Sequence, residues 1–335
     1  MTLLFFILFF LTGTVNAAPL IEDPTFLQLG TADGLAQDKV QDIVRDRDGF
    51  IWVATEGGVS RWDGYRFVTL EGPDGLFVNN EIRNLFVDSS NRLWVSTYSD
   101  GVYFFDLNSN RYQLVSRVSY FDEEGWTQGA DAFEELADGS MVVALEQHII
   151  RYYPQTGEST ELYRLTKEHI AEGDVIRDVK SIGDQLFIAT SYGLEVMSLS
   201  KGLASLKTLN YLPAGDISNL SVNTKTLYTP SPDTLFIGTV GGLFSIPVTG
   251  FTEKDGDVIE VQGSRVVKDR NIWTMTPAGN GEYWLGTDLG LFRLYRENDQ
   301  WQNSHILYPH AGIIALADKS IRSLLSDEQG NLWMG

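Results

Sequence analysis

The sequence contains no cysteine, which excludes disulfide bonds, thiolate metal sites and a cysteine nucleophile. Histidine is scarce: the four residues are His148, His169, His305 and His310, and we expect no metal site from them. The phosphate-binding pattern G-x-x-x-x-G-K-S/T, the G-x-S-x-G nucleophile elbow and the H-E-x-x-H zinc motif are also missing. We therefore expect no catalytic residue, no metal and no cofactor in this chain.

Basic residues are few relative to acidic ones. Lys and Arg total 25 against 45 Asp and Glu, so the 335-residue chain has a formal net charge of −20. This sign is wrong for neutralising phosphates or binding an anionic membrane surface, and we expect no nucleic-acid partner. We interpret the charge as a solvated surface that keeps the protein soluble. The adjacent acids Glu123-Glu124 and Glu134-Glu135 are interpreted as surface groups rather than as an acid–base pair.

One long apolar run is present, and it lies at the N-terminus. Leu3–Leu11 are apolar, and Val15-Asn16-Ala17 resembles an A-x-A cleavage site. The run is shorter than the roughly 20 residues that a membrane-spanning helix needs. We predict a signal peptide over residues 1–17 and an exported domain over residues 18–335.

One pattern recurs seven times along the chain. It is a turn with Asp, Asn or Gly, then a short apolar run that usually carries an aromatic residue, often followed by Thr and Gly; "DGFIWVATEGGV" and "PDTLFIGTVGGL" are two copies. The aromatic-equivalent positions, called markers here, are Trp52, Trp94, Val142, Phe187, Phe236, Trp284 and Trp333. Their spacing of 42 to 49 residues is typical of propeller blades. Helical repeats are disfavoured, because apolar residues alternate in steps of two and are often β-branched or aromatic.

The first repeat predicts four strands over residues 40–46, 50–55, 59–62 and 65–70, separated by turns that contain Gly. A four-stranded sheet cannot bury both faces alone, so the units should pack around a ring. We therefore predict an all-β propeller of four-stranded blades with seven repeat motifs. The markers should be core residues between blades. Thr55, Thr97, Thr190, Thr239 and Thr287 should bond the local backbone. The third repeat lacks the aromatic, the Thr and the Gly, and is placed by its spacing.

The last repeat stops at "NLWMG", so we expect a truncated last blade and a chain that is a fragment. The segment "PTFLQLG" from Pro24 resembles an outer strand that could pair into the incomplete blade. At least one strand would still be missing, which would leave an unpaired apolar edge. A chain extended by about 20 to 40 residues is expected to be more stable and less prone to aggregate.

The repeats resemble those of the two-component regulator propeller family, D-x-x-G-x-I/L-W-I/V-G/A-T-x-x-G-I/L. The segments around Trp52, Trp94 and Trp284 match best, and the resemblance covers residues 25–335. The sialidase-type Asp box needs an Asp five residues before the Trp, whereas Asp46 and Asp48 lie six and four before Trp52.

The resemblance implies an extracytoplasmic, periplasmic ligand sensor. It also implies that the full-length protein is anchored in the inner membrane by a segment outside this chain. A cytoplasmic histidine kinase or diguanylate cyclase would then carry the output.

A ligand of such a ring should bind at one mouth, where turns from successive blades converge. The candidate ligand residues are Tyr98, Asp100, Tyr192 and Asp288, which follow the second strands of their repeats. Tyr faces and carboxylates suit the rings and hydroxyls of sugars, so the expected ligand is a saccharide or another small extracellular molecule. Two alternatives stay open, a propeller hydrolase or lyase acting on glycans and a protein-binding adaptor. A homodimer also stays open.

Overall fold

The computed structural model describes residues 27–72, 75, 77, 80–98, 100–109, 111–117, 130–212, 223–249, 251–253, 258–306 and 320–335. Nearly all regular structure in these residues is β-strand; the α-helix among them is the five-residue α1 (Lys167–Ala171). Two 3-10 turns, Thr31–Asp33 and Gly202–Ser205, complete the helical part. None of the helices in the described part has the length and apolar character of a membrane span. The predicted signal peptide lies outside the described residues.

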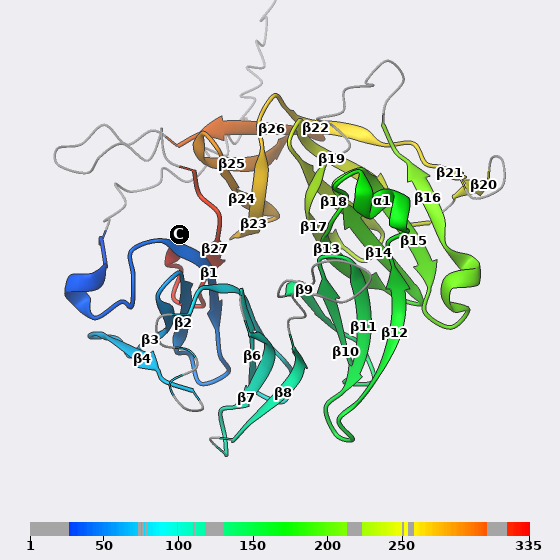
Figure 1. Ribbon diagram of the computed structural model, residues 1–335. Helices are drawn as coiled ribbons and strands as arrows, with labels where there is room; N and C mark the ends of the chain where they lie inside the picture. Colours follow the sequence, from blue (N-terminus) through cyan, green and yellow to red (C-terminus); the bar gives the residue numbers. More distant parts are fainter. Residues whose placement is uncertain are drawn as a thin grey trace, which may run out of the picture.

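The sheets radiate from a common centre, and the first strand of each lies innermost (Figure 1). Six blades have four antiparallel strands in sequence order from the inside outward. The first three blades comprise β1 (Val40–Arg45), β2 (Ile51–Thr55), β3 (Gly58–Trp62) and β4 (Phe67–Leu70); β5 (Ile82–Val87), β6 (Arg92–Thr97), β7 (Gly101–Asp106) and β8 (Arg111–Arg117); and β9 (Ala130–Glu135), β10 (Met141–Leu145), β11 (His148–Tyr153) and β12 (Glu158–Arg164).

The next three blades and a two-stranded seventh sheet complete the ring. They comprise β13 (Ile176–Ile182), β14 (Gln185–Thr190), β15 (Gly193–Ser198) and β16 (Lys207–Asn210); β17 (Thr224–Ser231), β18 (Thr234–Thr239), β19 (Gly242–Pro247) and β22 (Ser264–Lys268); β23 (Ile272–Gly279), β24 (Glu282–Thr287), β25 (Gly290–Glu297) and β26 (Gln300–His305); and β27 (Leu324–Ser326) with β28 (Leu332–Met334). The predicted propeller fold is confirmed, including the four-stranded third blade, with six complete blades and a seventh repeat that forms two strands.

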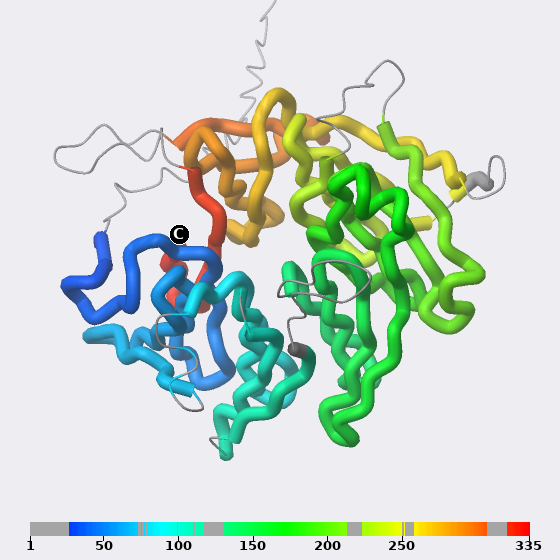
Figure 2. The backbone as a smooth tube through the Cα atoms, in the orientation of Figure 1, coloured from blue at the N-terminus to red at the C-terminus, as the bar shows by residue number. Residues whose placement is uncertain are grey.

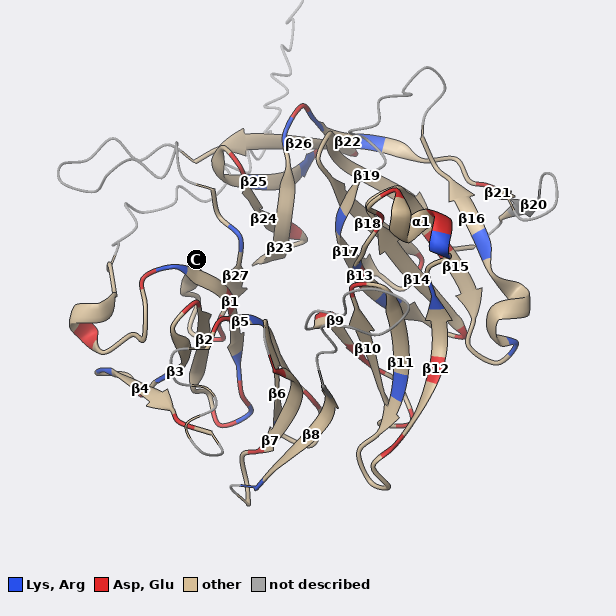
Figure 3. Ribbon diagram, viewed as in Figure 1, with Lys and Arg blue, Asp and Glu red and all other residues tan. Residues whose placement is uncertain are grey.

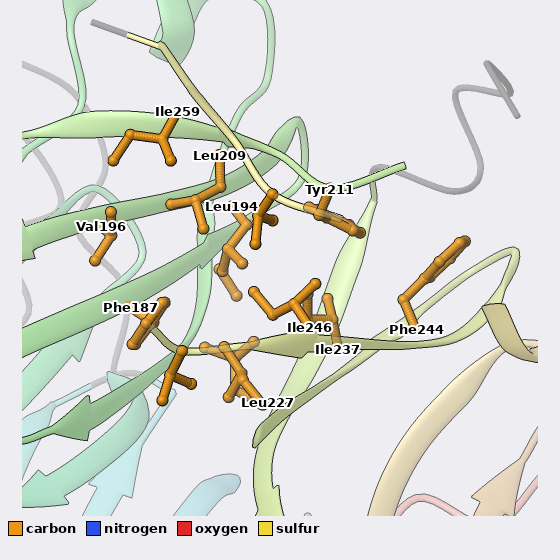
Figure 4. Close-up of a cluster of buried hydrophobic side chains, with 14 residues drawn as sticks. Phe187, Leu194, Val196, Leu209, Tyr211, Leu227, Ile237, Phe244, Ile246 and Ile259 are labelled. Atoms are coloured by element: carbon orange, nitrogen blue, oxygen red, sulfur yellow. The ribbon is translucent and has the colours of Figure 1, made fainter. Parts of the chain in front are cut away.

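Each marker lies on the second strand of its sheet and packs against the next blade around the ring. Trp52 lies in one buried cluster with Leu85 and Val95 of the second blade, and the same relation recurs at every interface. Figure 4 shows the core between the fourth and fifth blades, where Phe187 lies with Leu227. The expectation that the markers are core residues is confirmed for the five on β2, β6, β10, β14 and β18, which are buried.

The last interface closes the ring without a covalent link. Trp333 of β28 packs against the first blade and meets Trp62 edge-on, with 6.4 Å between the ring centroids. Figure 2 shows this C-terminal segment beside the blue first blade. Trp284 and Trp333 are only half-buried, because each lies at an interface that the two-stranded sheet helps to form.

The repeated threonines hold the turn after the second strand in five of the seven repeats. The Thr55 hydroxyl donates to the Gly58 carbonyl at 2.9 Å and accepts the Gly57 N–H at 3.1 Å. The threonines at 97, 239 and 287 donate in the same way to the carbonyl three or four residues later, and Thr190 accepts the Tyr192 N–H. All five are buried, so the predicted role as backbone partners is confirmed.

An aspartate six residues before each of three marker tryptophans holds the turn at the opposite end of the blade. The Asp46 carboxylate accepts the Trp52 indole N–H at 2.7 Å and the Asp48 and Phe50 backbone N–H groups. Asp88 with Trp94 and Asp327 with Trp333 repeat this arrangement at 2.7 and 3.0 Å. The sequence analysis gave this aspartate no role.

Two further features differ from the sequence expectation. Residues between β19 and β22 form β20 (Thr252–Glu253) and β21 (Val258–Glu260), and β21 pairs parallel with β16, so the fourth sheet gains two strands from the fifth repeat. The segment Leu27–Gly30 forms no strand, so the expected N-terminal outer strand is wrong for these residues. Pro24–Phe26 lie outside the described part.

Candidate functional site

Every inner strand of the six complete blades carries an extra residue near its start. Val40 pairs with Thr55 and Asp42 with Ala54, so Gln41 has no partner residue on β2. The same register shift occurs in β5, β9, β13, β17 and β23. In the seventh repeat, the N–H groups of Arg322 and Ser323 both donate to the Gly335 carbonyl, at 2.8 and 3.2 Å, which gives Arg322 the same place. Such a β-bulge redirects one side chain out of the sheet pattern.

The unpaired residues form a ring at one end of the inner strands, which we call the bulge ring. Its members, in order around the propeller, are Gln41, Arg83, Asp131, Arg177, Lys225, Trp273 and Arg322. The turns after the second strands lie at the same end, because each bulge lies beside the pair that includes the repeated threonine position. The bulge ring therefore lies at the face where we expected a ligand.

In several repeats the residue after the bulge connects neighbouring inner strands. The Asp42 carboxylate accepts the Leu85 N–H at 2.9 Å, and the Asp178 carboxylate accepts the Leu227 N–H at 2.7 Å. The Ser323 hydroxyl donates to Asp42 at 2.9 Å, which links the seventh repeat to the first. Burial raises the pKa of Asp42, and raises that of Asp178 to about 6, although these hydrogen bonds oppose the shift. These contacts fix the backbone that carries the bulge ring.

One half of the bulge ring is an ion-paired cluster. The Arg83 guanidinium lies 2.9 Å from an Asp131 oxygen and 2.8 Å from a Glu146 oxygen. Arg177 approaches the other Asp131 oxygen at 4.0 Å. Burial raises the pKa of Asp131 to about 6, and Glu146 adds to this effect, whereas the charges of Arg83, Arg177 and Lys225 oppose it.

The other half gathers cations around an indole. Lys225 Nζ lies 5.6 Å from the centre of the Trp273 ring, and Arg322 Cζ lies 5.1 Å from it. Burial and the neighbouring charge of Arg177 lower the pKa of the Lys225 amine. The buried Trp273 Nε1 and Arg177 Nε have no hydrogen-bond partner in the described part of the chain. Figure 3 shows blue, basic segments on the inner strand β17 and just before the inner strand β27.

The bulge ring is positively charged in an acidic protein. It holds four cationic side chains and one carboxylate, Asp131, with Glu146 at its edge, whereas the whole chain carries a net charge of −20. Clustered charge of one sign raises the local concentration of the opposite ion. The arrangement can therefore bind anionic groups, and its arginines and carboxylates can donate to or accept from hydroxyl groups.

Of the four residues that the sequence indicated, Tyr98 lies against the bulge ring. Its ring centre is 5.7 Å from Arg83 Cζ, and 41% of the side chain is exposed. Asp100 lies in the same turn and accepts from the Asn80 amide at 2.6 Å.

Tyr192 and Asp288 lie in the equivalent turns of the fourth and sixth blades. The Tyr192 hydroxyl donates to the Glu172 carbonyl at 2.7 Å, and Asp288 accepts the Asn271 N–H at 3.0 Å. Among the described residues, neither forms a hydrogen bond or ion pair with a member of the bulge ring. The bulge ring itself was not predicted from the sequence. Alignment of the repeats on their inner strands would have revealed basic residues recurring at one place.

The opposite end of the ring has a hollow of about 480 Å³ lined by Arg45, Asp88, Glu135 and Glu328, among others. Several of its charged groups are already engaged: Arg45 pairs with Glu328 at 2.9 Å, and the Ser89 N–H donates to Glu135 at 2.7 Å. It is the weaker candidate for a ligand site.

The acidic pair Glu134-Glu135 is engaged in structural contacts. Glu134 is buried and lies 2.8 Å from Lys180 Nζ, so the interpretation as a surface group is wrong for this residue. Glu123-Glu124 and His310 lie outside the described residues. Among the residues that the structure describes, no three His, Asp or Glu side chains are grouped closely enough to hold a metal ion.

Comparison with known proteins agrees with the repeats. The family described as two component regulator propeller matches residues 34–57 and 76–99, which contain the second strands of the first two blades. Over these two segments the chain is similar to the two-component regulator propeller family. Histidine kinase P4 of Formosa agariphila is 24% identical over 199 residues, which are 56% of this chain and 14% of that protein. The chain thus spans a small part of the length of this relative.

Solved structures with low sequence identity share the propeller fold. The extracellular domain of a hybrid two-component system of B. thetaiotaomicron has a TM-score of 0.66 and 20% identity, over 89% of this chain and 37% of that one. Virginiamycin B lyase of Staphylococcus aureus has a TM-score of 0.62 and 12% identity, over 89% of this chain and 91% of the lyase. At these low sequence identities, the structural similarity shows a shared fold and does not show a shared activity.

Proposed function

We propose that this two-component regulator propeller is the exported ligand-sensing part of a signalling receptor. It binds a saccharide or another small extracellular molecule, and the signal passes to a cytoplasmic output domain elsewhere in the full-length protein. The relationship to a histidine kinase and the fold shared with an extracellular sensor domain support this proposal. The domain would comprise residues 18–335 after removal of a signal peptide.

The observation that carries the proposal is the bulge ring. Its side chains come from all seven inner strands, so one ligand at this face would contact several blades at once. Tyr98 and Trp273 supply aromatic groups, and Arg83 and Asp131 supply donors and acceptors. Because the inner strands are linked by buried hydrogen bonds, the site is organised before the ligand arrives, which lowers the entropic cost of binding.

The glycan hydrolase or lyase alternative has one observation in its favour. Asp131, whose pKa is raised to about 6, lies near a second carboxylate, Glu146, as an acid–base pair would require. Both carboxylates, however, pair with the same arginine, Arg83, at 2.9 and 2.8 Å. This sharing favours a charge-balanced binding cluster over a free acid and base.

Calorimetry on the purified chain with cellohexaose, maltohexaose and tetragalacturonate tests the proposal. Tyr98→Ala is expected to weaken binding at least fivefold, because the exposed ring lies against the bulge ring. Tyr192→Ala is the matched control, since its hydroxyl is engaged by the Glu172 carbonyl. If titration with each of the three sugars gives no heat of binding, the sensing proposal is overturned. If new reducing ends form while the sugars are incubated with the protein, the hydrolase is supported instead.

A further inference from the structure

Among the described residues, three cations of the bulge ring have no carboxylate that pairs with them alone. Lys225 and Arg322 form no ion pair within 4.0 Å in the described part of the chain, and the carboxylate nearest Arg177 is Asp131 at 4.0 Å. That carboxylate already pairs with Arg83 at 2.9 Å. Elsewhere in this acidic protein, arginines such as Arg92 and Arg293 lie 2.5 to 2.6 Å from a carboxylate.

Two of these cations, Arg177 and Lys225, are half-buried, and Arg322 is exposed beside them. Trp273 lies between Lys225 and Arg322, and its ring attracts both through cation–π contacts. Burial lowers the pKa of the Lys225 amine, and the nearby charge of Arg177 lowers it further, as expected for two neighbouring cations. Among the described residues, Arg177 Nε and Trp273 Nε1 have no acceptor, so they add two buried donors to the site. A buried donor without a partner costs about 1 to 3 kcal/mol, and an acceptor that reached it would recover part of that cost.

Building on the proposed function, we infer that the ligand is an acidic saccharide whose carboxylate or sulfate groups bind between Arg177, Lys225 and Arg322. An anion at this place would relieve the repulsion among the cations. Arginine also presents paired N–H groups that match the oxygens of carboxylate and sulfate. Long polyanions such as nucleic acids fit poorly, because the chain as a whole carries a net charge of −20.

Tyr98 and Asp131 can contact the sugar part of the ligand. Tyr98 offers an exposed aromatic face beside Arg83, and Asp131 offers carboxylate oxygens to hydroxyl groups. One Asp131 oxygen has no hydrogen-bond partner among the described residues. Charge recognition on one half of the bulge ring and hydroxyl recognition on the other together favour a charged sugar over a free inorganic anion.

The experiment compares charged and neutral probes on the full chain. Tetragalacturonate and a sulfated carrageenan tetrasaccharide are titrated beside cellotetraose and sodium sulfate. At least one acidic sugar is expected to bind at least tenfold more tightly than cellotetraose, and its affinity should fall as NaCl rises from about 50 to 500 mM. Lys225→Met keeps the length of the side chain and removes its charge, and it should cost at least tenfold in affinity.

Lys201→Met is the matched control, because Lys201 is exposed and lies before the 3-10 turn Gly202–Ser205. It should leave the affinity unchanged. Arg322→Gln is a second variant at an exposed member of the ring, and it should weaken binding even if Lys225→Met does not fold.

Each outcome separates the two proposals. Equal binding of neutral and acidic sugars, or undiminished affinity in Arg322→Gln, would overturn the acidic ligand and leave the sensing function standing. If sulfate binds as tightly as the acidic sugars, the inference that the ligand is a saccharide is overturned. Absence of binding by all four probes would overturn both proposals.

Discussion

Trp94→Ala tests whether the markers hold the blades together. Trp94 is fully buried on β6, and its ring lies 5.1 Å from the ring of Phe104, 6.0 Å from Phe133 and 5.9 Å from Tyr152. Two of these partners belong to the third blade, so the substitution opens a cavity between blades. Replacing a buried Trp by Ala typically costs about 3 to 5 kcal/mol in the free energy of unfolding.

Trp94→Phe separates the hydrogen bond from the packing. The indole N–H donates to Asp88 at 2.7 Å, and Asp88 keeps Arg92 and the Ser90 N–H as partners when the indole is removed. Loss of a buried hydrogen bond to a charged group costs about 1.5 to 3 kcal/mol. We therefore expect Trp94→Phe to cost less than Trp94→Ala.

Urea denaturation followed by circular dichroism measures both changes, with equal m-values as the condition for comparing midpoints. Trp284→Ala is the matched control, because this marker is at the same strand position and only half-buried. It should cost roughly half as much, since less apolar area is lost. A cost below about 1 kcal/mol for Trp94→Ala would refute the packing argument.

Three further predictions concern the turns and the bulge ring. Thr287→Val should cost about 1 to 3 kcal/mol in urea denaturation, because it leaves the buried Gly290 carbonyl and Leu289 N–H without the hydroxyl; no change would contradict this role. Gly242→Ala should cost roughly 2 kcal/mol or more, since φ is +143° and the added Cβ would lie 2.1 Å from the Val267 carbonyl oxygen. Gly183→Ala, at φ +60° with no atom within 4 Å, should cost only about 1 kcal/mol, and equal costs would contradict the argument. In the folded chain the pKa of Asp131 is about 6, above its ordinary value of 3.8. The folded chain therefore binds a proton more readily than the unfolded chain, so the free energy of unfolding should rise as pH falls from about 7 to 5. Asp131→Asn should flatten this rise in thermal melts. An unchanged pH profile would contradict the assignment of the rise to Asp131.

Local features of the sequence determined the repeat architecture. Each second strand carries a marker, and five of these strands end in a threonine. Both residues act within one blade or at the next interface, so their spacing was enough to predict them. Thr55 bonds residues two and three positions away, and Asp46 bonds Trp52 six positions away. Such short-range chemistry repeats in the sequence because it repeats in the structure.

The tertiary structure alone decided which side chains meet at the centre. The link from Asp42 on one inner strand to the Leu85 N–H on the next joins residues 43 positions apart, and the bulge beside it sets the place of Gln41. Strand alternation alone predicts neither this shift nor the meeting of Lys225 and Arg322 at Trp273. The pairing of β21 with β16 and the half-burial of Trp284 also depend on neighbours distant in sequence. The sequence determined the blades, whereas ring closure placed their inner strands side by side and so assembled the candidate site.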